Sequence, residues 1–184
     1  MGGKITPNNR IACEDLILGD SSVVSRQWVH LPAGGALPTP EQMLESYLVF
    51  LRRCTLSLVR PVASAGGIAF RLVGLRNPLL LFDPPESSRD GASRSVALRI
   101  QGGLLVQGRE CGRGMLTFTV SPLPDGVELA VQVADYCPLL LGGPGHSLLR
   151  SRLYRSTQAI VHRLITVRFL DHLCRSLERG EQIT

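Results

Sequence analysis

The chain has 184 residues, of which 44% are hydrophobic and 19% are charged, and this favours one domain with a sizeable core. Its formal net charge of +5 comes almost entirely from arginine, because Lys4 is the only lysine. No basic run exceeds two residues and aromatic residues make up only 5%, so a nucleic-acid partner is not expected.

The N-terminal region is predicted to open with an arm and two strands. We expect residues 1–10 to form a loose arm and residues 11–184 to form a single α+β domain. Two short apolar patches, at residues 16–18 and 23–24, are separated by a Gly-Asp pair that is typical of a turn. These patches are predicted to belong to two strands around that turn.

A strong helix start signal follows at Thr39. Thr39 can cap the helix, Pro40 suits the first helical position, and Gln42 lies where a capping box requires it. Apolar residues then recur at helical spacing. We expect this helix to end near Arg60, because Pro61 follows.

Alternating apolar residues then predict a meander of at least four antiparallel strands. The predicted strands span residues 68–72, 79–82, 96–107, 116–120 and 127–133. Residues 83–94 contain two prolines and mixed charge, which predicts an exposed loop. The pair Gly102-Gly103 interrupts the third of these strands and predicts a bulge or a sharp bend.

The last forty residues predict a long helix. Residues 146–179 contain no proline or glycine, and residues 159–173 are apolar on almost every side. Such a helix needs a concave surface to cover it, which the meander is expected to supply. The predicted fold class is therefore α+β, with a curved antiparallel meander packed around a long C-terminal helix and one additional N-terminal helix.

This order of elements, over residues ~20 to ~180 within boundary errors of a few residues, resembles the helix-grip architecture of the START/Bet v1-like superfamily, which includes polyketide cyclase-like proteins. The resemblance implies an apolar cavity between sheet and helix, often for a lipid, a sterol or a polyketide-like molecule. The chain differs from the superfamily in having one longer N-terminal helix instead of two short ones. No functional residue is carried over.

We therefore predict a non-enzymatic protein that binds an apolar small molecule or lipid between the meander and the last helix. The alternative is that the same residues fill a solid core. The candidate lining residues are Tyr47, Phe70, Leu72, Leu98, Ile100, Phe118, Val131, Leu153, Tyr154, Ile160 and Leu164.

Two other functions remain open. A cyclase- or hydrolase-like enzyme in the same pocket would need Asp135, Tyr136, Tyr154 and His162 to converge. An interaction module would have a solid core and would dock its arginine-edged C-terminal helix on an acidic partner or on anionic lipid. The oligomeric state is not predicted.

The remaining reactive residue types give weak signals. The five cysteines form no Cys-x-x-Cys pair and the histidines have no metal-site spacing, so we expect no metal, no cofactor and free thiols in a cytoplasmic protein. Cys111, between Arg109 and Arg113, is the best candidate for a reactive thiol. Arg71 and Arg99 are expected to face solvent. No apolar run is long enough for a transmembrane segment.

Overall fold

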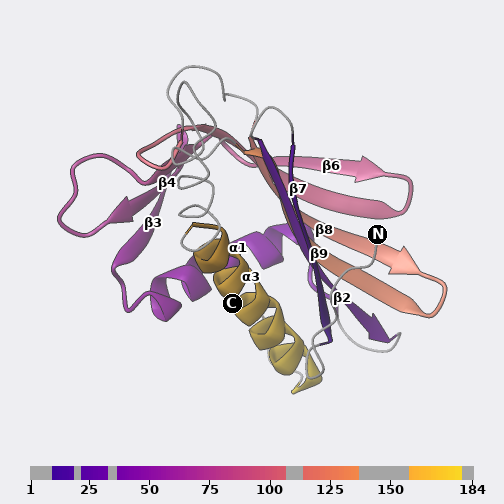
Figure 1. Ribbon diagram of the computed structural model, residues 1–184. Helices are drawn as coiled ribbons and strands as arrows, with labels where there is room; N and C mark the ends of the chain where they lie inside the picture. The colour runs from indigo at the N-terminus through magenta and orange to yellow at the C-terminus, as the bar shows by residue number, and fades with distance from the viewer. Residues whose placement is uncertain (1–9, 19–21, 33–36, 107–113, 137–157, 180–184) are drawn as a thin grey trace.

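The computed structural model describes residues 10–18, 22–32, 37–106, 114–136 and 158–179, which form nine strands and two helices (Figure 1). The strands are β1 (Ile11–Ile17), β2 (Val23–Pro32), β3 (Val59–Ser64), β4 (Gly67–Leu72), β5 (Leu80–Phe82), β6 (Glu86–Asp90), β7 (Ser93–Gly102), β8 (Met115–Leu123) and β9 (Gly126–Tyr136). The helices are α1 (Pro40–Cys54) and α3 (Gln158–Glu178). The predicted N-terminal arm lies outside the described residues.

All nine strands join one open antiparallel sheet. Its order is β1-β2-β9-β8-β7-β5-β4-β3, and β6 pairs with β7 outside this path. α1 packs on β3, β7 and β8, whereas α3 packs on β1, β2 and α1, so both helices cover one face of the sheet (Figure 1). This arrangement confirms the predicted α+β class, in which an antiparallel meander packs against a long C-terminal helix and one additional N-terminal helix is present.

The start of α1 follows its sequence signal, but its end does not. Thr39 and Gln42 form the predicted capping box. The helix stops at Cys54, six residues before the expected end at Arg60, and the chain turns through positive φ angles of 51° at Leu56 and 61° at Ser57. Pro61 then lies in β3, an edge strand of the sheet, where a missing N–H is tolerated.

The segment 83–94 is not the loop that its composition predicts. β6 forms there and pairs with β7 although every residue of β6 is exposed. With no buried face, the strand shows no apolar alternation for sequence analysis to detect. β7 ends at Gly102 rather than continuing to residue 107, because Gly103 adopts a φ of +126° where the backbone of Leu79 passes closely.

α3 buries one stripe rather than its whole circumference. The buried side chains of α3 are Thr166, Phe169, Leu170, Leu173, Cys174 and Ser176. On the opposite side Leu164 is 45% exposed, and Arg168 and His172 are also exposed. The prediction that the helix is covered on nearly every side is therefore wrong for the described part of α3. An open sheet reaches one side of a helix, and one apolar stripe is enough for that contact.

Three aromatic rings join the two helices to the sheet. Tyr47 of α1 lies 5.3 Å from Phe118 of β8 and 5.2 Å from Phe169 of α3, measured between ring centroids. Phe118 and Phe169 make an edge-to-face contact at 6.4 Å. Such pairs contribute about 0.5–1.5 kcal/mol beyond burial, so these rings hold α1, α3 and the sheet together.

Candidate functional site

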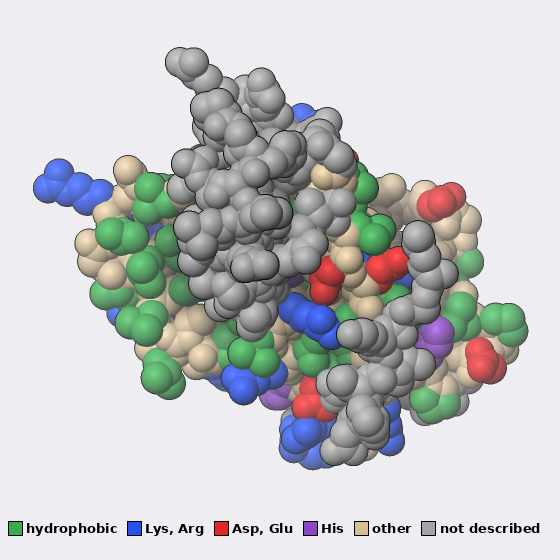
Figure 2. Space-filling view, in the orientation of Figure 1, with side chains coloured by type: hydrophobic (Ala, Val, Ile, Leu, Met, Phe, Trp, Pro, Cys, Tyr) green, Lys and Arg blue, Asp and Glu red, His purple; other side chains and the backbone are tan. Residues whose placement is uncertain are grey.

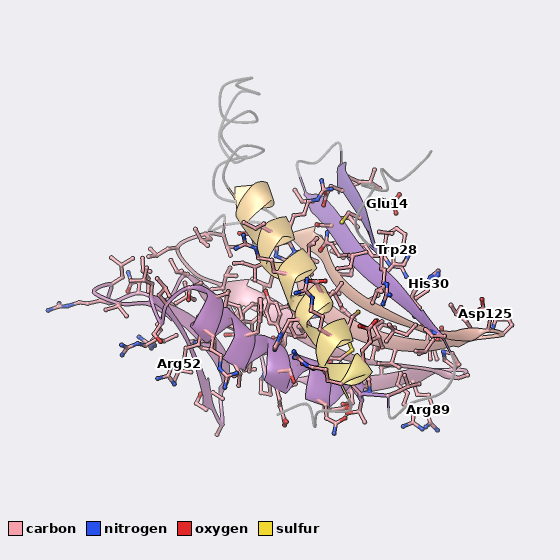
Figure 3. All side chains as sticks on the ribbon, turned by 90° about the horizontal axis from the view of Figure 1, so that it is seen from below. Glu14, Trp28, His30, Arg52, Arg89 and Asp125 are labelled. Atoms are coloured by element: carbon pink, nitrogen blue, oxygen red, sulfur yellow. The ribbon has the colours of Figure 1, made fainter. Side chains whose placement is uncertain are left out.

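The inner face of the sheet becomes polar at β1 and β2. The strand register places Asp15 opposite Ser25 and Cys13 opposite Gln27. Ser25 is 6% exposed and Gln27 is fully buried. Residues that alternate with this set, such as Trp28, point away from α3 (Figure 3). The polar set therefore lies on the same face as the helices.

A chain of hydrogen bonds links these side chains. The Ser25 hydroxyl donates to Asp15 Oδ1 over 2.5 Å, and Gln27 Nε2 donates to Ser25 Oγ over 2.8 Å. From α3, Arg163 places a guanidinium nitrogen 3.6 Å from Asp15 Oδ2. The chain runs inward from this half-exposed ion pair and ends at the Gln27 amide.

Three buried polar atoms at this sheet–helix interface have no hydrogen-bond partner in the described structure: Gln27 Oε1, His162 Nε2 and Thr166 Oγ1. His162 and Thr166 are four residues apart and so lie on the same side of α3. A buried polar group without a partner costs about 1–3 kcal/mol. Three such groups at one interface identify it as the candidate site, since a bound molecule would satisfy them.

Two buried titratable groups at the site, His162 and Tyr47, are neutral at pH 7. Burial lowers the pKa of His162 to about 4, and the nearby Asp15 carboxylate opposes this effect only in part. Burial also raises the pKa of Tyr47, so its phenol keeps its proton. The Thr166 hydroxyl lies beside that phenol without forming a hydrogen bond of standard geometry.

An apolar wall borders the polar set. Val131 of β9 is paired with Gln27 on one side and with Phe118 on the other. Phe118 in turn contacts Tyr47 and Phe169. The candidate site therefore combines a polar end at β1–β2 with an apolar side toward β8 and α1.

The structure separates the predicted lining residues. Tyr47, Phe118 and Val131 are buried beside the polar set, and Leu98 and Ile100 are buried further along the sheet in β7. Phe70 and Leu72 belong to β4, where Phe70 packs against Phe82. Leu164 is exposed, the side chain of Ile160 is not described, and Leu153 and Tyr154 lie outside the described residues. Ligand contact by these eleven residues stays a prediction.

Sequence analysis missed Asp15, Ser25, Gln27 and Thr166. Ser25 and Gln27 occupy the inward positions of β2 between Val23 and Val29. Two polar residues at consecutive inward-facing positions of a predicted strand could have indicated a polar site from the sequence. Thr166 gave no signal, because threonine within an apolar helix is ordinary.

The convergence of Asp135, Tyr136, Tyr154 and His162 that the enzyme hypothesis requires stays a prediction. The Tyr136 hydroxyl donates to the carbonyl oxygen of Leu105 over 2.8 Å, and Tyr154 is outside the described residues. Cys111 is also outside them. Arg71 and Arg99 are exposed, as expected.

Two searches of the described residues found nothing. No group of three or more histidine, cysteine, aspartate or glutamate side chains is placed to hold a metal ion. Neither described helix combines the length and apolar character that crossing a membrane requires.

Comparison with known proteins assigns no family to this chain. No protein-family model matches it, and no curated protein matches it. Among solved structures, the crystal structure of CalU16 from Micromonospora echinospora aligns with 12% identity and a TM-score of 0.31, covering 69% of this chain and 68% of that one. The function is therefore argued from the geometry of this chain.

Proposed function

We propose that this protein binds a small amphipathic molecule between the β1–β2 edge of the sheet and α3, without catalysing a reaction on it. The observation that carries the proposal is the set of unpartnered buried atoms on Gln27, His162 and Thr166. Native proteins rarely leave such atoms unpaired. A ligand with a matching polar group would recover their hydrogen bonds.

The polar end of the ligand is expected to be a neutral group such as a hydroxyl. Gln27 Oε1 accepts a hydrogen bond, and the Thr166 hydroxyl can donate or accept one. Gln27 is linked through Ser25 to the Asp15 carboxylate, and this negative charge disfavours an anionic head group at the site. A hydroxyl would donate to Gln27 and accept from Thr166.

The apolar body of the ligand is expected to lie along the wall at Val131, Phe118 and Tyr47. These residues adjoin the polar set and are among those predicted from the sequence to line a cavity. The order of elements supports the same class of ligand, because it resembles that of helix-grip proteins. Membership of the START/Bet v1-like superfamily is part of this proposal.

Native mass spectrometry of protein purified from its own host tests the proposal. We expect extra mass that leaves when the protein is denatured. The apo protein should also bind a fluorescent long-chain alcohol more tightly than the corresponding acid. A clean apo mass, together with no binding of the alcohol, would contradict the proposal.

A pair of matched substitutions tests the location of the site. Gln27→Leu removes the unpaired carbonyl and should weaken binding of the alcohol about 10-fold, the equivalent of one hydrogen bond. Gln132→Leu on β9 is the control, because Gln132 is paired with Arg26 and lies on the outer face of the sheet. Equal binding by the two variants would place the ligand elsewhere.

A further inference from the structure

An exposed aliphatic patch lies on the β3–β4 hairpin and the turns beside it, far from the candidate site. Leu56 is 86% exposed, Leu58 56%, Val73 51%, Leu75 47% and Val62 46%. Figure 2 shows hydrophobic side chains gathered at this end of the molecule, at the left of the view. Single exposed apolar residues are ordinary, but a group of five in one place indicates an interaction surface.

The strand register puts three of these residues on one side of the hairpin. Arg60 is opposite Arg71, Val62 is opposite Ala69, and the backbone N–H of Val73 donates to Leu58 over 2.9 Å. Alternate residues of a strand share a face, so Leu58, Val62 and Val73 flank the two arginines. We call this surface, together with Leu56 and Leu75 in the adjoining turns, the hairpin face.

The hairpin face carries a charge arrangement that favours an anion. Arg60 and Arg71 are directly opposite, and like charges in that position destabilise a strand pair. Their side chains hydrogen-bond only to backbone oxygens, at Ser57 and Arg76, among the interactions described. No described carboxylate forms an ion pair with either arginine. An anion bound between them would remove the repulsion.

More arginines surround the same end of the molecule. Arg52 and Arg53 are exposed in the last turn of α1, which leads directly into Leu56 (Figure 3). Arg76 follows Leu75 and is also exposed. Aliphatic side chains interspersed with arginines match the interface of an anionic bilayer, where aliphatic side chains insert among the lipids and guanidinium groups bind phosphate.

We propose that the hairpin face docks on a membrane that contains anionic lipid. This function is separate from ligand binding at α3 and uses different residues. A protein partner that adds a strand at the β3 edge fits less well, because Pro61 lacks the N–H that strand addition would use.

Vesicle co-sedimentation tests the proposal with the full chain. We expect binding to vesicles of phosphatidylcholine with phosphatidylserine, weaker binding in high salt, and little binding to phosphatidylcholine alone. Replacing both Arg60 and Arg71 by Gln should reduce affinity about 30-fold, at about 1 kcal/mol for each basic residue near the surface. Leu56→Asp with Leu58→Asp should also abolish most of the binding.

Two exposed positions away from the hairpin face serve as controls. Leu37→Asp changes a residue that is 46% exposed and precedes the N-terminus of α1, at the end of the helix opposite to Leu56. Arg89→Gln removes a charge from β6. Both should bind anionic vesicles as the unmodified protein does, and all variants should keep its circular dichroism spectrum.

Three results would overturn the proposal. The first is no binding to anionic vesicles, and the second is equal binding by the hairpin and control variants. The third is retention on immobilised polyaspartate without vesicle binding, which would indicate an acidic polymer as the partner instead.

Discussion

The two halves of the inner sheet face differ in chemistry although both are covered by a helix. Beneath α1, strands β7 and β8 present Val96, Leu98, Leu116 and Phe118, all at most 4% exposed. At the α3 end, β1 and β2 present a polar set that includes buried Gln27. Of the four buried side-chain atoms without a partner in the described structure, three lie in the α3 half and one, Ser46 Oγ, lies on α1.

We expect this difference to separate stability from the proposed binding function within one layer. Truncating a buried side chain in a half that serves only stability should lower the free energy of unfolding. A half that serves binding should hold groups whose removal costs the fold little or even stabilises it, since functional sites retain unfavourable features. The predictions below test that contrast.

The largest effect is expected at the centre of the α1 half. Phe118→Ala removes a fully buried ring that contacts Tyr47 and Phe169, and should lower the free energy of unfolding by about 3–5 kcal/mol. Urea denaturation followed by circular dichroism measures this loss. Thr117→Ala, one residue away on the outer face, should cost far less. Similar losses in both variants would show that the core is not packed around this ring.

The pH dependence of stability should report on His162 in the α3 half. Its pKa is lowered to about 4 in the folded protein and is about 6.5 when unfolded, so the unfolded chain binds the proton first as pH falls. The part of the stability that depends on neutral His162 is therefore fully present above pH 6.5 and is lost toward pH 4. The free energy of unfolding should fall by about 2 kcal/mol between pH 7 and pH 4.5. Asp15 and Arg163 are the charged groups nearby.

The variant His162→Leu checks this assignment. Its free energy of unfolding should change less between pH 7 and pH 4.5 than that of the unmodified protein. An identical pH profile in both proteins would mean that another group causes the acid sensitivity.

The sequence predicted local features of the fold better than features that depend on distant contacts. The capping box at Thr39 and the alternation along β7 are local, and both are present. The early end of α1 depends on left-handed turn residues at Leu56 and Ser57, which neither residue type signals. β6 exists because β7 offers an unpaired edge, and no pattern within β6 reveals that.

The candidate site was harder to predict than the sheet around it. Tyr47, Phe118 and Val131 were predicted because apolar residues at regular spacing face inward. Gln27 and Thr166 are polar, and only the packing of α3 on β2 shows that they are buried at one interface. A site made of polar residues from separate elements leaves little trace in the sequence of either element.

The smallest effect tests the contrast most directly. Thr166→Val keeps the shape of a fully buried side chain but removes a hydroxyl that has no partner. It should raise the free energy of unfolding by about 1 kcal/mol, because an unsatisfied buried hydroxyl is lost. Thr117→Val on the outer face is the control and should stay within about 0.5 kcal/mol. If Thr166→Val instead destabilises the protein, the hydroxyl is bonded within the fold and the α3 half is built for stability as well.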